Sequence, residues 1–260
     1  MTPGRTISAA VTAASAAVAF AAGCGGGEKT AATAGGGPAA GGKLPEATTF
    51  TTLKGLPLDP EPFGRTDGTV VHPTTPLPVS AQPGGPAVAT LPDKQLGGPT
   101  WVPVVERRPG WNRVLLPSRP NRVTGWIPGA PDKVETARSS HGVKVDVSER
   151  RLTLTESGRK VGSWTVAVGA AGTPTPTGRT FLLASLAPSK PAYSPLILPV
   201  GAHSETLDSY GGGPGTVAFH GWPSKDVFGK AVTHGCIRVP ADALTRLAKA
   251  PLGTPVEIVD

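Results

Sequence analysis

The residues best suited to chemistry lie between His220 and Arg238, where one cysteine stands close to two histidines. Cys236 is the candidate nucleophile, and His220 and His234 are the imidazoles that could take its proton. An imidazole that removes a thiol proton and later returns a proton to the leaving group is sufficient for nucleophilic acyl transfer. A thiol of ordinary pKa is mostly protonated at neutral pH, so it needs such a partner. This stretch therefore predicts a cysteine-dependent enzyme.

The neighbours of the thiol suggest further roles. Gly235 lets the backbone approach the thiol closely, and the amides of Gly235 and Cys236 are candidates for an oxyanion hole. Gly221 offers a carbonyl that could set the tautomer of His220. Arg238 lies two residues beyond the thiol, so in an extended segment it would point to the same face. There it could bind a substrate carboxylate or favour the thiolate.

Several of these residues also have structural alternatives. His234 could be a buried histidine bonded to backbone, Thr233 could cap a turn, and Arg238 could be an ordinary ion-pair residue. A zinc site made by His220, His234 and Cys236 is a further alternative. No Asp or Glu stands at the spacing expected of a base for zinc-bound water, so we predict neither a metal nor a cofactor.

The elements that must position these residues are mostly strands. Alternating apolar residues predict a hairpin around the 148–151 turn, and further apolar runs predict strands over 161–168, 179–183, 196–200, 216–219 and 255–259. One short helix is expected after Pro240, because Asp242 complements its N-terminal dipole and an apolar stripe follows. The glycine-rich stretch 210–215 fits a flap or tight turn beside the site. Many strands and one short helix predict a β-sandwich or barrel-like core.

The order of these segments resembles the YkuD-type L,D-transpeptidase catalytic domain from Val143 to the end of the chain. The likeness is carried by His220, then twelve residues, then the block Thr-His-Gly-Cys-Ile-Arg that begins at Thr233. It implies a mostly β protein with a β-sandwich fold over 143–260 and one or two short helices. It also implies that Cys236 is the nucleophile and His220 its base.

The resemblance further implies a reaction on peptidoglycan stem peptides. The thiol would attack the carbonyl of the third stem residue, meso-diaminopimelate or similar, and the terminal D-alanine would leave. A side-chain amine of a neighbouring stem would then take the acyl group, which makes a 3→3 cross-link. An L,D-carboxypeptidase using the same thioester and a non-catalytic wall-binding lipoprotein remain as alternatives. We expect His234 and Gly235 to support catalysis, and the substrate to contact Thr233, Gly221, Trp222 and Arg238.

The first residues have the pattern of an export signal, with Arg5 followed by an apolar run from Ala9 to Ala22. The sequence that ends at Cys24 resembles a bacterial lipoprotein signal, although Ala21 stands where leucine is usual. We therefore expect a signal peptide over 1–23, a lipid anchor on Cys24, and a protein outside the cytoplasm that faces the cell wall. An ordinary cleaved signal is the alternative. Either way we expect the mature protein to work outside the cytoplasm. If Cys24 is acylated or removed, Cys236 has no intramolecular disulfide partner.

Composition divides the region before the catalytic domain. Residues 1–142 hold 19 of the 30 prolines and 21 of the 35 glycines. We predict a flexible tether over 24–69, because it contains very few branched apolar or aromatic residues. Short apolar runs between turns predict a small all-β module over 70–132, and its 110–127 segment resembles a bacterial SH3-type domain. The net charge of +7 favours acidic surroundings such as the cell wall, and no basic helix suited to nucleic acid is evident.

Overall fold

β-Strands make up almost all regular structure in the computed structural model, which describes residues 43–189 and 193–260. One α-helix occurs among these residues, so the prediction of a mostly β protein is confirmed. Lys43–Asp260 form one compact unit. The predicted signal peptide, Cys24 and the first part of the predicted tether lie outside the described residues. No helix in the described part is long and apolar enough to cross a membrane.

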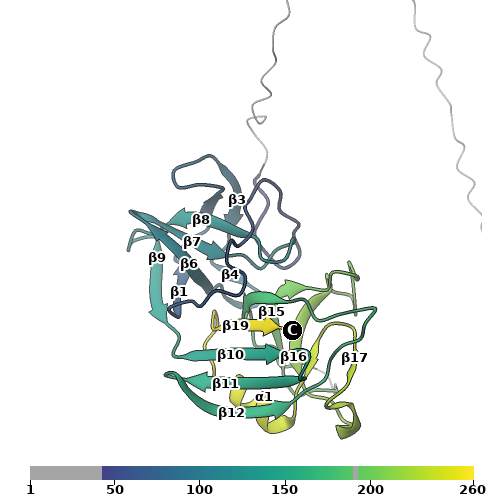
Figure 1. Cartoon of the computed structure of the whole chain (residues 1–260). Helices are drawn as coiled ribbons and strands as arrows, with labels where there is room; N and C mark the ends of the chain where they lie inside the picture. Colours follow the sequence, from purple (N-terminus) through teal and green to yellow (C-terminus); the bar gives the residue numbers. More distant parts are fainter. Residues whose placement is uncertain (1–42, 190–192) are drawn as a thin grey trace, which may run out of the picture. The chain divides into compact units, whose positions relative to one another are not determined.

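The first β region is a seven-stranded sheet with the order β3-β2-β8-β7-β6-β1-β9. Figure 1 shows β6, β7 and β8 of this sheet side by side. Its strands are β1 Thr69–Pro73, β2 Leu77–Ser80, β3 Ala87–Leu91, β6 Val102–Arg108, β7 Trp111–Leu115, β8 Thr124–Pro128 and β9 Val134–Arg138. A separate ribbon consists of β4 Lys94–Gln95 and β5 Gly98–Pro99. All pairs in the large sheet are antiparallel. β9 extends this module beyond the predicted boundary at residue 132, because it pairs with all of β1.

Residues 43–68 pack against this sheet, so the predicted flexible tether over 24–69 is wrong for this part. Leu53 is buried in the core of the module. The carboxylate of Asp59 is fully buried and forms a two-pronged ion pair with Arg179 of the catalytic half. The composition of this segment misled the prediction because a few buried apolar residues, together with hydrogen bonds and one buried ion pair, are enough to hold it in place.

The catalytic half begins with a five-stranded sheet in the order β12-β11-β10-β19-β14. The bounds are β10 His141–Asp146, β11 Arg151–Glu156, β12 Arg159–Thr165, β14 Gly178–Phe181 and β19 Pro255–Val259. Figure 1 shows β10, β11 and β12 side by side, which confirms the hairpin predicted around the 148–151 turn. The C-terminal strand β19 lies between β10 and β14, parallel to β10 and antiparallel to β14.

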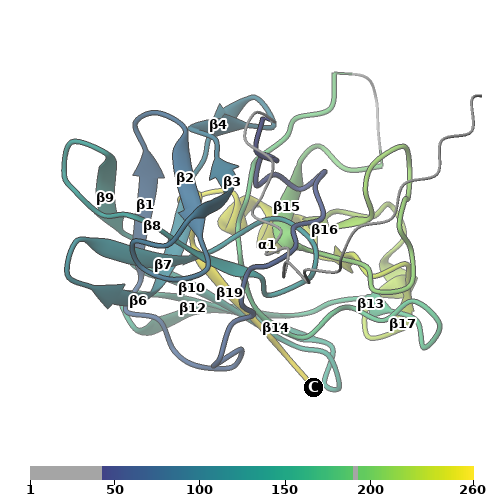
Figure 2. The same cartoon turned by 90° about the horizontal axis from the view of Figure 1, so that it is seen from above.

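The remaining elements carry the candidate site. They are β13 Val168–Gly169, β15 Ile197–His203, β16 Thr216–His220, a 3₁₀ turn η1 Lys225–Val227, β17 Ala231–Thr233, β18 Ile237–Arg238 and α1 Ala241–Leu247. Strands β15, β16 and β18 form a three-stranded sheet, and β13 pairs with β17. Figure 2 shows β15 and β16 beside each other. The helix begins directly after Pro240, as predicted.

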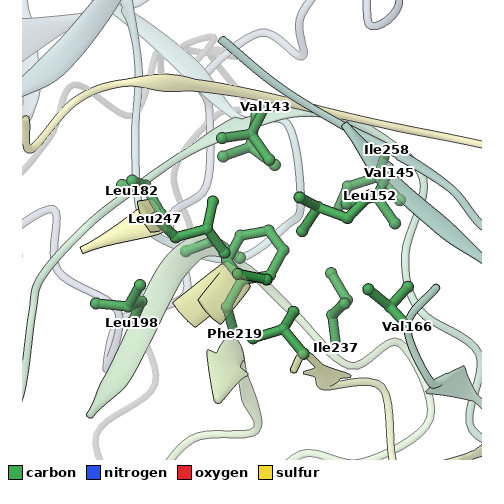
Figure 3. Close-up of a cluster of buried hydrophobic side chains, with 14 of the residues drawn as sticks. Val143, Val145, Leu152, Val166, Leu182, Leu198, Phe219, Ile237, Leu247 and Ile258 are labelled. Carbon is green, nitrogen blue, oxygen red and sulfur yellow. The ribbon is translucent and has the colours of Figure 1, made fainter. Parts of the chain in front are cut away.

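The core of the catalytic half lies between its sheets and α1. Val145 and Leu152 come from the five-stranded sheet, Phe219 and Ile237 from the three-stranded sheet, and Leu247 from the helix. All five are completely buried, and Figure 3 shows Phe219 in the midst of the cluster. Side chains of two facing sheets that meet in one core make a β-sandwich, so this prediction is confirmed.

The two halves also share buried side chains. Phe181, the last residue of β14, and Leu183 are buried in the core of the N-terminal module rather than in that of the catalytic half. The module is therefore joined to the catalytic half by apolar packing as well as by the ion pair of Asp59 with Arg179.

Candidate active site

The candidate nucleophile lies on a tight turn between β17 and β18. The Thr233 hydroxyl donates a hydrogen bond to the carbonyl of Cys236 at 2.6 Å and accepts one from the amide of Gly235 at 3.1 Å. Gly235 has a φ of 112°, a conformation that side-chain-bearing residues rarely adopt. Its carbonyl accepts a hydrogen bond from the Thr175 hydroxyl at 2.9 Å. These bonds fix the backbone on both sides of the thiol.

Two predictions for this turn need correction. Thr233 is 2% exposed and its hydroxyl is committed to the turn, so it does not offer the predicted substrate contact. The amide of Gly235 already donates to Thr233, so it is not free to stabilise an oxyanion. The amide of Cys236 donates to no backbone or side-chain acceptor in the described part of the chain, and it is the better candidate.

The candidate base is the last residue of β16. His220 is 5% exposed, and its Nδ1 lies 2.8 Å from the carbonyl oxygen of Gly221. A carbonyl only accepts hydrogen bonds, so Nδ1 carries the proton of the neutral ring and Nε2 keeps a free lone pair. Burial lowers the pKa of His220, and the nearby Arg238 charge adds to this effect, while the Gly221 bond opposes it. The ring is therefore neutral at pH 7 and able to accept a proton at Nε2.

The pairing of β16 with β18 brings base and nucleophile to one face. His220 stands opposite Arg238 in this parallel ladder, one position beyond the pair of Phe219 and Ile237. Neighbouring residues of a strand point to opposite faces, and Phe219 and Ile237 point into the core. His220 and Arg238 therefore face away from the core, and Cys236 directly precedes β18 in the turn beside them. The sequence signature is thus assembled by one pair of strands.

The environment of the thiol favours its neutral form at rest. Burial raises the pKa of Cys236, which is only partly offset by a backbone hydrogen bond at Ala218 and by the Arg238 charge. A thiol in this state is a weak nucleophile. Attack on a carbonyl then requires transfer of the thiol proton to a base, and His220 has the free nitrogen for it.

Arg238 places an unneutralised charge beside this pair. Its guanidinium carbon lies 3.5 Å from the centroid of the Trp222 ring, a cation–π contact. Its Nε is buried without a hydrogen-bond partner, and no described carboxylate lies within ion-pair distance. The ordinary ion-pair alternative for Arg238 is therefore wrong among the described residues. Its charge is available to an anionic ligand.

Two aromatic side chains form the wall next to the base. Tyr193 meets His220 edge-on with ring centroids 4.9 Å apart, and it lies 5.4 Å from Trp222. Together with Gly221 and the start of α1, these two aromatic residues line an apolar cavity of about 220 Å³. The amide of Gly221 is held by the hydroxyl of Ser194 at 2.7 Å. The predicted Gly221 and Trp222 thus lie at the site, whereas Tyr193 and Ser194 were missed because no motif surrounds them.

His234 lies at the outer side of the turn. Its side chain is exposed and stacks on the ring of Tyr210, with centroids 4.8 Å apart and planes inclined by 28°. The alternative of a buried structural histidine is therefore wrong. Tyr210 opens the glycine-rich stretch that we expected beside the site. No group of three or more His, Cys, Asp or Glu side chains within 43–189 and 193–260 could hold a metal ion.

The sequence of the region that carries the candidate site is similar to that of one known family. Residues 140–258 match the L,D-transpeptidase catalytic domain, the YkuD family. No curated protein matches the chain. Similar solved structures include an L,D-transpeptidase from Mycobacterium smegmatis, at 18% identity over 60% of this chain and 80% of that one, with a TM-score of 0.41. Another is L,D-transpeptidase 3 from Mycobacterium tuberculosis with a faropenem-derived adduct, at 16% identity over 54% and 74%, with a TM-score of 0.40. A third is the catalytic domain of an E. faecium L,D-transpeptidase, at 20% identity over 45% and 94%, with a TM-score of 0.34.

Proposed function

We propose that residues 140–258, which match the L,D-transpeptidase catalytic domain of the YkuD family, transfer acyl groups of peptidoglycan stem peptides through a thioester on Cys236. The observation that carries the proposal is the hydrogen bond from Nδ1 of His220 to Gly221, which leaves Nε2 free as an acceptor on the strand that pairs with β18, directly after Cys236. A neutral base beside a neutral thiol fits a reaction in which the proton moves during attack.

In the first step the sulfur of Cys236 attacks the carbonyl carbon of the third stem residue. The thiol proton passes to Nε2 of His220, and negative charge develops on the carbonyl oxygen. The amide of Cys236 has no acceptor in the described part of the chain and would stabilise that oxygen. The carbon–nitrogen bond to D-alanine then breaks, and the leaving nitrogen takes the proton from His220. A thioester and free D-alanine result.

In the second step a side-chain amine of a neighbouring stem attacks the thioester. His220 takes a proton from this amine, and the sulfur leaves and regains a proton. The products are a 3→3 amide cross-link and the free enzyme. Arg238 would bind a carboxylate of the peptide, because its charge has no acidic partner among the described residues and is stacked on Trp222.

The cellular setting is part of the same proposal. A lipid anchor on Cys24 would hold the protein at the outer face of the cell membrane, where peptidoglycan is available. The net charge of +7 would favour the carboxylate-rich wall. Labelling with a radioactive fatty acid tests the anchor, because Cys24→Ala should abolish incorporation. Label retained by that variant contradicts the anchor.

Product analysis with defined muropeptides tests the activity. Purified protein incubated with disaccharide-tetrapeptides should release D-alanine and yield a cross-linked dimer, and Cys236→Ala should yield neither. Release of D-alanine with only tripeptide product would replace the transferase with a carboxypeptidase. Folded wild-type protein that releases no D-alanine contradicts the proposed function altogether.

A further inference from the structure

The loop 204–215 connects the two strands that frame the site. It leaves β15 after His203 and enters β16, the strand that ends at the candidate base. Three of its glycines, Gly211, Gly212 and Gly215, have φ values of 59°, 82° and 72°. It forms no strand or helix, and its one internal bridge joins Tyr210 to Gly213. A loop of this composition has little conformational preference of its own, so contacts from outside help to set its shape, together with its few internal hydrogen bonds.

Those contacts come from the N-terminal module. The guanidinium of Arg119 donates hydrogen bonds to the carbonyls of Ser204 at 2.9 Å, Leu207 at 3.0 Å and Pro214 at 3.0 Å. These three carbonyls lie at both ends of the loop, so one side chain holds both ends, beside the hydrogen bond from the Ser204 amide to the Gly215 carbonyl at 2.8 Å. Hydrogen bonds with a charged donor are stronger than neutral ones. Arg119 is itself fixed, because its backbone bonds with Thr51 and Leu53.

A second side chain, two residues after Arg119, holds the end of β15. The side-chain amide of Asn121 donates to the carbonyl of His203 at 2.8 Å and accepts from its amide at 2.8 Å. The ring of His203 is also bonded to the module, through the carbonyl of Thr49 at 2.8 Å. The start of the loop is thus attached to the module by its backbone and by a buried side chain.

The loop in turn contacts the catalytic turn. Tyr210 stacks on His234, which lies two residues before the candidate nucleophile. Ser204 lies near the same turn, since a Cβ built on Gly235 would come within 3.9 Å of its Cβ. Displacement of the loop would therefore remove the ring that stacks on His234, in the segment that presents Cys236.

We propose that Arg119 and Asn121 are positioning residues of the acyl-transfer site, acting through the loop 204–215 and Tyr210 on the turn that carries Cys236. The inference rests on the proposed function of Cys236 as the acylated nucleophile. It gives the N-terminal module a role within the reaction. Small displacements of reacting groups can lower a rate substantially. Loss of the hydrogen bonds that Arg119 and Asn121 make should therefore change kcat more than KM.

Kinetics of Cys236 acylation with Arg119→Ala test the coupling. We expect the rate of thioester formation to fall about tenfold, with KM nearly unchanged. Tyr210→Ala should give a similar loss, and the double variant should lose little more than either single variant, because both act along one path. Arg108→Ala is the matched control in the same module, since Arg108 is 63% exposed and pairs only with Glu106. It should retain the wild-type rate.

A second control separates positioning from stability. Val79→Ala removes apolar volume from the core of the module without touching the loop, and it lowers the melting temperature. The proposal is overturned if Val79→Ala, at the same loss of melting temperature, lowers the acylation rate as much as Arg119→Ala does. The hydrogen bonds of Arg119 to the loop would then serve stability alone. Additive losses in the double variant of Arg119 and Tyr210 also overturn it. Should Arg119→Ala not fold, Asn121→Ala carries the same test.

A measurement without substrate makes the inference independent of the proposed function. In the histidine side-chain NMR spectrum, Arg119→Ala should shift the His234 resonances in the direction that Tyr210→Ala shifts them, because both remove ring stacking. Unchanged His234 resonances in Arg119→Ala overturn the proposal. If wild-type protein forms no thioester, the proposed function fails, and this spectrum still decides whether the module positions the turn.

Discussion

Removal of the buried carboxylate at Asp59 should strongly destabilise the protein. Asp59 is completely buried and Arg179 is 6% exposed, and two hydrogen bonds join them. Arg179 is held further by the carbonyl of Gly64 at 3.2 Å. In Asp59→Ala the guanidinium keeps its charge in a buried site and loses its acidic partner. Loss of one member of a buried ion pair typically costs about 3–5 kcal/mol of the free energy of unfolding.

The double variant Asp59→Leu/Arg179→Met tests whether the unpaired buried charge, rather than a loss of packing, causes the destabilisation. It removes both charges and keeps much of the apolar volume, so its stability should lie within about 2 kcal/mol of the wild type. Urea unfolding followed by tryptophan fluorescence measures both variants. A loss below about 1 kcal/mol in Asp59→Ala would refute the reasoning, because it would mean that the segment around residue 59 does not dock in solution.

Three further predictions concern protonation and packing. Burial lowers the pKa of His220, so the acid limb of the Cys236 acylation rate should lie below about pH 6.5, and a limb above that value would contradict the assignment. The pKa of His203 is lowered to about 4, mainly by burial. As the pH falls, His203 takes up a proton in the unfolded chain before it does so in the folded chain, which favours unfolding. The contribution of the neutral His203 to the free energy of unfolding is therefore complete above about pH 6.5 and lost by about pH 4, a loss of roughly 3 kcal/mol. Urea unfolding should show the advantage of wild type over His203→Gln shrinking across that window, and a constant difference would exclude it. Phe219→Ala should lower the unfolding free energy by about 3–5 kcal/mol, since the ring is fully buried, and calorimetry that finds a much smaller loss would place Phe219 outside a rigid core.

Local patterns predicted the frame of the site well. The alternation from Val143 to Val147 predicted a strand because one face of β10 is buried against the core. Pro240 and the apolar stripe after it predicted α1, since capping and periodicity are properties of neighbouring residues. The spacing from His220 to the block at Thr233 indicated a shared site, and the pairing of β16 with β18 supplies it.

Contacts between distant segments could not be predicted in the same way. The docking of residues 43–68 depends on Asp59 meeting Arg179, 120 residues further along the chain. The stacking of His234 depends on Tyr210, 24 residues earlier in the chain, and the hydrogen bonds of Arg119 to the loop depend on the fold of the module. The hydrogen bond from the Gly235 amide to the Thr233 hydroxyl follows from the geometry of one turn, which residue types alone do not determine.

The most direct measurement of the central claim is the mass of the protein after brief incubation with a tetrapeptide donor, without an acceptor. The account predicts an adduct equal to the donor less D-alanine, located by peptide mapping on Cys236 and absent from Cys236→Ala. It also predicts slower adduct formation in His220→Ala, by about 10²- to 10⁴-fold. A folded wild-type protein that carries no adduct, or an adduct that persists in Cys236→Ala, would contradict it.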